Sequence, residues 1–158
     1  MSAQKKTIHK NNSGVFFESR KFTKFEEPTR QVLFFVFSLL KKRKVQCNVF
    51  FLSTAAMRGI NFRHKKKNKG ATVLSFVADN KIPHPEVEKG HVYLGEIYLA
   101  PTYIYRAKKE TPARYLIHGI LHLCGYTHVR ACDRMQMEAL EEKIILALRE
   151  KKILPDDF

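Results

Sequence analysis

The sequence of 158 residues lacks any apolar stretch long enough to cross a membrane. Its longest apolar run lies between Val32 and Leu40 and ends at Lys41, at about half the length that a membrane span requires. Residues 1–12 are polar and basic, without the apolar centre of a signal peptide. We therefore expect a soluble, cytoplasmic protein with no membrane partner.

Cysteine is scarce as well. The chain has three cysteines, Cys47, Cys124 and Cys132, which are too few and too widely spaced to form a disulfide framework. No two of them have the CxxC spacing that many zinc and redox sites share. The cysteines therefore fit a reducing compartment.

Acidic residues are nearly absent from the first part of the chain. Up to Gly70 there are 3 acidic residues against 17 lysines and arginines, whereas the remainder has 12 of each. The whole formal charge of +14 therefore arises before residue 71. Such one-sided charge predicts contact with polyanions, with nucleic acid ahead of anionic membrane. A solvated basic face that serves only solubility is the other interpretation.

The pattern of apolar and turn-forming residues predicts an α+β protein. Runs rich in β-branched and aromatic residues predict strands at residues 45–52, 72–77 and 92–99. Capping residues, prolines in first turns and apolar spacing predict helices at residues 28–40, 53–58, 111–124 and 132–151. The expected architecture is a small mixed β-sheet with helices packed on it.

No internal repeat or second domain is visible. We expect one domain over residues 15–158, preceded by a flexible basic tail at residues 1–14. Residues 61–70 (NFRHKKKNKG) are expected to form a dense basic loop. Gly95 lies in the middle of the third predicted strand, where glycine indicates a bulge or a close approach of another backbone.

The segment His118–His128 (HGILHLCGYTH) carries three histidines at a metal-binding spacing. Four residues advance a helix by about 400 degrees, so His118 and His122 project from one face of the predicted helix. Gly125 ends this helix and lets His128 return toward them from the following turn. Three imidazoles leave one tetrahedral position of a zinc ion open, as catalytic sites do. We therefore predict one Zn²⁺ here, although imidazole also suits Ni, Cu and Fe.

Metzincin proteases share this histidine spacing in their motif HExxHxxGxxH. The second position here is Gly119, so the glutamate that acts as general base in those proteases is absent. A protease would need a carboxylate from elsewhere, and Glu96 is the candidate. Cys132 is an alternative metal ligand, whereas Cys124 lies on the opposite side of the helix and is expected to pack in the core.

The histidine segment resembles the signature HGxLHLxGYDH of the YbeY family of bacterial rRNA maturation factors. Three further segments resemble that family in the same order along the chain. They are Ala71–Phe76, which is similar to the family's TNVLSF strand, Leu94–Ile97, which is similar to its LGDI, and Met137–Glu142, which is similar to the helix after the metal motif.

The resemblance implies a zinc-dependent single-strand endoribonuclease that acts in 16S rRNA maturation and ribosome quality control. Its implied partners are single-stranded RNA, rRNA and the small ribosomal subunit or ribosome. The implied zinc ligands are His118, His122 and His128. The family also has an arginine close to the metal, which falls at Lys65 or, if the loop shifts, at Arg63. We expect one of these two cations to hold phosphate and stabilise transition-state charge.

Two departures from the family pattern affect catalysis more than metal binding. Lys65 keeps the positive charge but lacks the planar fork of arginine. Thr127 replaces the aspartate before the last ligand, so that a partner of a ligand or an anchor of the loop could be missing.

The second hypothesis is a zinc protein without catalytic activity that binds RNA or the ribosome during assembly. In either case the clusters Arg58–Lys69 and Lys41–Lys44 would follow an RNA backbone. Phe62 or Tyr126 could stack on an unpaired base, or could serve as an ordinary core or rim aromatic.

Overall fold

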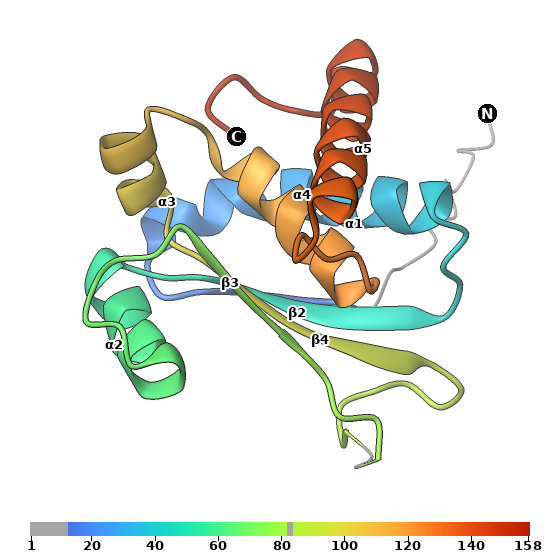
Figure 1. Cartoon of the computed structure of the whole chain (residues 1–158), viewed down its shortest axis with the longest axis horizontal. Coiled ribbons are helices and arrows are strands. Elements are labelled where there is room, and N and C mark those ends of the chain that lie inside the picture. Colours follow the sequence, from blue (N-terminus) through green and yellow to red (C-terminus); the bar gives the residue numbers. More distant parts are fainter. Residues whose placement is uncertain (1–12, 82–83) are drawn as a thin grey trace, which may run out of the picture.

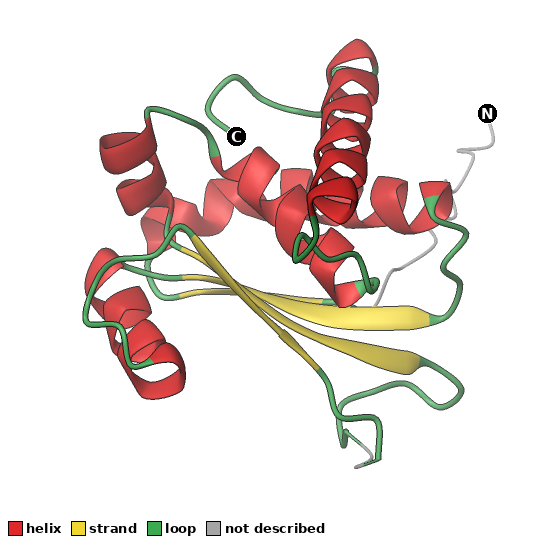
Figure 2. Ribbon diagram, in the orientation of Figure 1, coloured by secondary structure: helices red, strands yellow, loops and turns green. Residues whose placement is uncertain are grey.

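A four-stranded sheet organises the computed structural model, which describes residues 13–81 and 84–158 (Figures 1 and 2). The strands lie in the order β1-β2-β4-β3. Both β1 and β4 run parallel to β2, while β3 runs antiparallel to β4. Their bounds are Gly14–Phe17 for β1, Val45–Phe51 for β2, Val73–Val77 for β3 and Val92–Leu99 for β4. The predicted α+β fold with a mixed sheet is confirmed.

Helices lie on both faces of this sheet. The α-helices are α1 (Glu26–Leu39), α2 (Thr54–Lys65), α3 (Pro101–Tyr103), α4 (Pro112–Leu123) and α5 (Ala131–Glu150). A 3-10 segment, Arg20–Phe25, precedes α1, and a π-helical turn, Ile104–Lys108, follows α3. In Figure 1, α1 and α4 lie on one side of the sheet, α5 packs on α4, and α2 lies on the opposite side. None of the described helices is long and apolar enough to span a bilayer.

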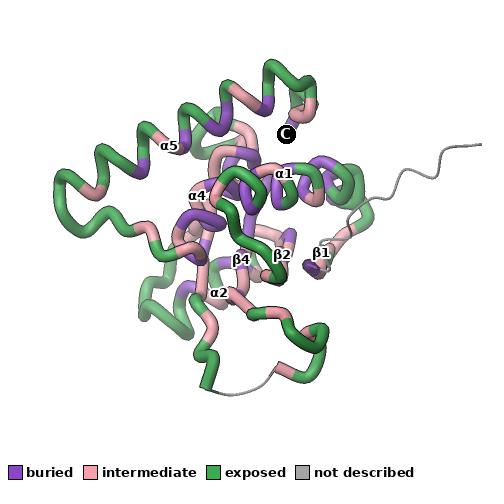
Figure 3. The backbone as a smooth tube through the Cα atoms, turned by 90° about the vertical axis from the view of Figure 1, so that its right-hand side faces the viewer, coloured by how far each residue is buried: buried purple, intermediate pink, exposed green. Residues whose placement is uncertain are grey.

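The alternation of side chains along β4 explains why two faces are covered. Ile97 and Leu99 are completely buried and pack with α4 in the main core. Tyr98 points the other way, toward a smaller cluster that contains Met57 of α2 and Leu74 of β3. Figure 3 shows the buried positions concentrated where α1, α4 and the strands meet. Because successive strand residues face opposite sides, α2 and α4 are separated by the sheet.

The start of the chain contains a strand that the sequence did not reveal. Ser13 is 3% exposed and Gly14 begins β1, although both residues fall in the predicted tail. Gly14 pairs with Asn48 of β2, and the pairing continues to Phe17 beside Phe51. Four residues are too few to show a clear alternation, so this edge strand is defined by its neighbour. The rest of the tail, residues 1–12, lies outside the described residues.

Helix α2 is longer than predicted. Its N-cap is Ser53, whose hydroxyl accepts a hydrogen bond of 3.2 Å from the amide of Ala56. The helix then continues to Lys65 and ends at Lys66, whose φ of 56° is left-handed. The prediction of a loop from residue 61 was therefore wrong. Lysine and arginine are good helix formers, and cations in a last turn interact favourably with the helix dipole.

The bulge predicted at Gly95 is confirmed. The register between β2 and β4 shifts there, so that Gln46 pairs with Tyr93 but Cys47 pairs with Gly95. Gly95 has a φ of +133°, and a Cβ atom on it would lie 2.0 Å from the carbonyl oxygen of Phe76. No side chain fits this position, so glycine is required where β4 pairs with the end of β3.

Replacing Gly95 with alanine should therefore lower the free energy of unfolding by about 2–4 kcal/mol, through backbone strain and overpacking together. Urea denaturation followed by circular dichroism measures this loss. Gly59→Ala is the matched control, because Gly59 lies in α2 and an added Cβ atom there would meet nothing within 4 Å. That substitution should stabilise the protein by about 0.5–1 kcal/mol. Equal effects from the two substitutions would contradict the steric argument.

Candidate metal centre

Helix α4 carries two of the three histidines. It begins with Pro112 at its first position, after Thr111 at the N-cap. The Thr111 backbone is extended as a cap requires, but its side chain makes no capping hydrogen bond. Apolar residues on one side of the helix pack against the sheet and α1. His118 and His122 lie one turn apart on the other side and are partly exposed.

The end of α4 returns the chain toward these two histidines. Gly125 has a φ of +96°, and its amide donates to the carbonyl of His122 at 3.0 Å. The amide of Tyr126 donates to the carbonyl of Leu121 at 3.0 Å, which completes a Schellman motif. As predicted, glycine thus ends the helix and allows the chain to turn. His128, on the exposed side of this turn, then faces His118 and His122.

The three imidazoles converge on one point. One ring nitrogen from each of His118, His122 and His128 lies within 4.8 Å of the others. The Nε2 atoms of His118 and His122 are 3.0 Å apart. Among the described residues, this is the one group of three or more histidine, cysteine or acidic side chains arranged to hold a metal ion.

The other nitrogen of two of these rings is already engaged. His122 Nδ1 lies 3.0 Å from the carbonyl oxygen of Tyr126, which can only accept a hydrogen bond. His118 Nδ1 lies 2.6 Å from Oε1 of Glu141, a carboxylate acceptor. Both Nδ1 atoms therefore carry a proton, and in the neutral form of the two rings both Nε2 atoms present lone pairs to one another. Two facing lone pairs repel, and a cation between them removes that repulsion, so the donor set fits a metal ion.

The surroundings also favour the neutral form of His122. Burial lowers the pKa of His122, and the neighbouring His118 lowers it further. A metal ligand must be deprotonated, so this shift favours metal binding near neutral pH.

Glu141 is the residue of the site that sequence reasoning missed. It lies on α5, is 6% exposed, and also approaches Arg114 at 4.0 Å. A signal for it was present in the sequence. Glu141 follows Met137 by four residues and precedes Ile144 by three, so it interrupts the buried stripe of α5 with a carboxylate. Buried carboxylates require a partner, and histidine supplies it here.

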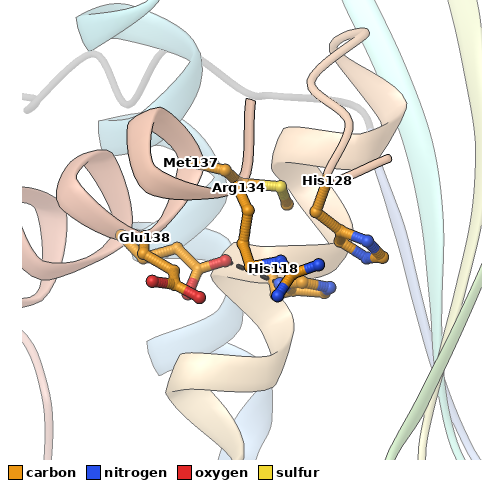
Figure 4. Close-up of a pocket in the computed structure, with 6 residues that line it drawn as sticks. His118, His128, Arg134, Met137 and Glu138 are labelled. Atoms are coloured by element: carbon orange, nitrogen blue, oxygen red, sulfur yellow. Dashed lines mark hydrogen bonds and ion pairs between the residues drawn. The ribbon is translucent and has the colours of Figure 1, made fainter. Parts of the chain in front are cut away.

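A cavity of about 290 Å³ opens beside the histidines. Figure 4 shows His118 and His128 on one side of this cavity and residues of α5 on the other. The lining residues are His118, His128, Arg134, Met137, Glu138 and Glu141. A ligand in this cavity would therefore contact the metal ligands directly.

The two predicted catalytic cations do not line this cavity. Arg63 and Lys65 lie in the last turn of α2, on the opposite face of the sheet from α4 (Figure 1). There Arg63 acts electrostatically on Tyr98, a residue of the smaller cluster. The resemblance alone placed these cations near the metal, and their catalytic role stays a prediction.

The remaining candidates are also separated from the histidines. Glu96 accepts a hydrogen bond of 2.6 Å from the hydroxyl of Tyr98, on the sheet face that α2 covers. Cys132 is exposed and is not part of the histidine group. Cys124 is partly buried against the core, as expected, and burial raises the pKa of its thiol to about 11.

Thr127, which replaces an aspartate of the family pattern, has a structural partner. The pKa of Asp133 is lowered mainly by its hydrogen bonds from Arg130, and Thr127 adds a smaller contribution. The consequence of losing the family's aspartate stays a prediction.

Fold and site together define a class: an α+β protein with a mixed sheet and a cluster of three histidines that could hold a metal ion. The chain belongs to the YbeY family, because the family profile described as Endoribonuclease YbeY matches residues 11–149.

Individual relatives agree with this assignment. The chain is 32% identical over 154 residues to the Endoribonuclease YbeY of Buchnera aphidicola subsp. Schizaphis graminum, covering 92% of this chain and 90% of the relative. It is 36% identical over 110 residues to that of Bartonella quintana, covering 65% and 68%. The solution structure of a Thermotoga maritima protein matches with a TM-score of 0.55 at 21% identity, covering 91% and 96%, and supports the fold alone.

Glu141→Gln should weaken zinc binding by about 10- to 100-fold, because the carboxylate that orients His118 and raises its basicity is lost. Competition against a chromophoric chelator measures the affinity. Glu142→Gln is the matched control, since this neighbour is exposed and pairs with Arg114 instead. Equal zinc affinity in both variants would show that Glu141 does not support the site.

Proposed function

We propose that this protein is a zinc-dependent endoribonuclease that cleaves single-stranded RNA during rRNA maturation and ribosome quality control. The observation that carries the proposal is the convergence of His118, His122 and His128 at the edge of an open cavity. Membership of the YbeY family supports RNA as the substrate. Ribosomal RNA and the small ribosomal subunit are the proposed partners, which is consistent with action in the cytoplasm.

The chemistry of the donor set suits hydrolysis. A zinc ion bound by the three histidines would supply Lewis acidity and an activated water for attack on a phosphodiester. Glu141 fixes the ring of His118, and the carbonyl of Tyr126 fixes that of His122. The ligands are therefore held in position before substrate arrives, which reduces the reorganisation that the reaction requires.

The structure also explains why peptide hydrolysis is the weaker alternative. Gly119 is buried, and a Cβ atom on it would lie 2.9 Å from Cγ2 of Ile97. A glutamate at this position would point into the sheet instead of toward the histidines. Glu96 is held on the far face by Tyr98, so it does not replace the missing base.

A basic surface on α2 supports RNA binding at a distance from the metal. We define the α2 basic surface as the exposed cations of the last helical turn and the following residues: Arg63, Lys65, Lys66, Lys67 and Lys69. Residues 54–78 contain no acidic side chain to offset this charge. Phe62, 52% exposed, lies within the same surface and could stack on a base. Tyr126 packs against the core, as the alternative interpretation expected.

The expected result for His122→Ala is a loss of RNA cleavage, because one zinc ligand is removed from a partly exposed position. Cleavage of a single-stranded rRNA fragment should be compared for zinc-loaded wild type and for the variant, purified in parallel. The parallel preparation controls for contaminating nuclease, and circular dichroism confirms the fold. If both preparations cleave equally, or neither cleaves, the nuclease proposal fails and a zinc-containing assembly factor becomes the better explanation.

Neutralising the α2 basic surface should weaken RNA binding and make it less sensitive to salt. For Arg63→Ala with Lys65→Ala, the plot of log affinity against log salt concentration should flatten by about 0.7 for each phosphate that the protein no longer neutralises. Fluorescence anisotropy with a labelled single strand provides the measurement. An unchanged slope would mean that this charge serves only solubility.

A further inference from the structure

Arg134 is the cation that reaches the metal cavity. It lies in the first turns of α5, and its side chain enters the cavity between the histidines and α5 (Figure 4). It is the only lysine or arginine among the described residues that line this cavity. The predicted cations of α2 are on the other face of the sheet, so they do not compete for this position.

The guanidinium of Arg134 is available for a ligand. Within residues 13–81 and 84–158, no hydrogen bond or ion pair engages it, whereas the neighbouring arginines are occupied. Arg130 binds Asp133 through two nitrogens at 2.9 and 3.0 Å. Arg114 pairs with Glu142. Arg134 is therefore unlike these two residues, which serve to hold elements together.

The helix dipole gives no reason for an arginine at this position. Cations near the start of a helix interact unfavourably with the helix dipole. Asp133 satisfies the preference for an acid in this first turn and is already paired with Arg130. The presence of Arg134 is therefore better explained by the cavity that its side chain lines than by its interaction with the dipole of α5.

The walls of the cavity fit an anion beside a metal ion. Glu141 is engaged by His118 at 2.6 Å and approached by Arg114, so its charge is largely compensated. Met137, 1% exposed, supplies an apolar wall that strengthens nearby electrostatic interactions. Glu138 is the acidic residue that remains, one turn beyond Arg134 on the same side of α5.

We propose that Arg134, His118 and His128 border a phosphate subsite, in which the Arg134 guanidinium binds one phosphate group of the RNA next to the metal. This assignment rests on the proposed nuclease function for the identity of its natural ligand. The planar guanidinium presents two parallel N–H donors that match two phosphate oxygens, which a lysine does not. Arg134 thus takes the role that the resemblance assigned to Lys65 or Arg63.

Inorganic phosphate tests this subsite without any cleavage reaction. Its binding to zinc-loaded protein is measured by ³¹P NMR titration for wild type, Arg134→Ala, Arg134→Lys and Arg149→Ala. Arg149, exposed in the last turn of α5, is the matched control for loss of one charge. Arg134→Ala should bind phosphate about 10- to 100-fold more weakly than wild type, with Arg134→Lys in between and Arg149→Ala unchanged. Zinc affinity should be the same in all four proteins.

Two results would overturn the subsite: equal phosphate binding by Arg134→Ala and Arg149→Ala, or a parallel loss of zinc affinity in Arg134→Ala, which would indicate a structural role. The nuclease proposal is tested separately, by cleavage of the rRNA fragment by the wild-type protein. A selective loss of phosphate binding supports the subsite even if wild type does not cleave. Cleavage by wild type with phosphate binding unaffected by Arg134→Ala overturns the subsite alone.

Discussion

Helix α4 packs very closely on β4, and this contact positions the side chains of the metal centre. Gly119 faces Ile97 so closely that an added Cβ atom would approach Cγ2 of Ile97 to 2.9 Å. The helix can therefore lie lower on the sheet than one carrying a side chain there. This contact fixes the orientation of α4. His118 and His122 therefore project away from the sheet, toward α5 and the turn that follows α4. Gly119 also occupies the position at which a metzincin protease has its glutamate.

The metal centre joins elements that are far apart in the sequence. His118 and His122 come from α4, His128 from the turn that Gly125 allows, and Glu141 from α5. The hydrogen bond between His118 and Glu141 spans 23 positions along the chain. It does two things at once, because it fixes the imidazole and it satisfies a buried carboxylate. The geometry of the site therefore depends on how α5 docks on α4, and a shift of α5 would change the ligands as well as the cavity.

The sheet separates the α2 basic surface from the metal centre. The α2 basic surface faces one side, while the histidines and Arg134 face the other. Charge spread over exposed lysines provides affinity that falls with salt and carries little geometric information. One guanidinium beside the histidines would provide orientation instead. In this arrangement RNA would be attracted by one surface and positioned by another, which suits a substrate longer than the cavity itself.

Features that depend on neighbours along the chain could be predicted from the sequence. The α+β class, the three longer strands, α4 with its two histidines one turn apart, the stop at Gly125 and the bulge at Gly95 all follow from local periodicity and backbone freedom. Tertiary structure alone decided the rest. The pairing of β1, the hydrogen bond of Glu141 with His118 and the position of Arg134 in the cavity each require a partner from a distant segment. A short edge strand or an exposed cation carries no local pattern that identifies such a partner, so packing had to supply it.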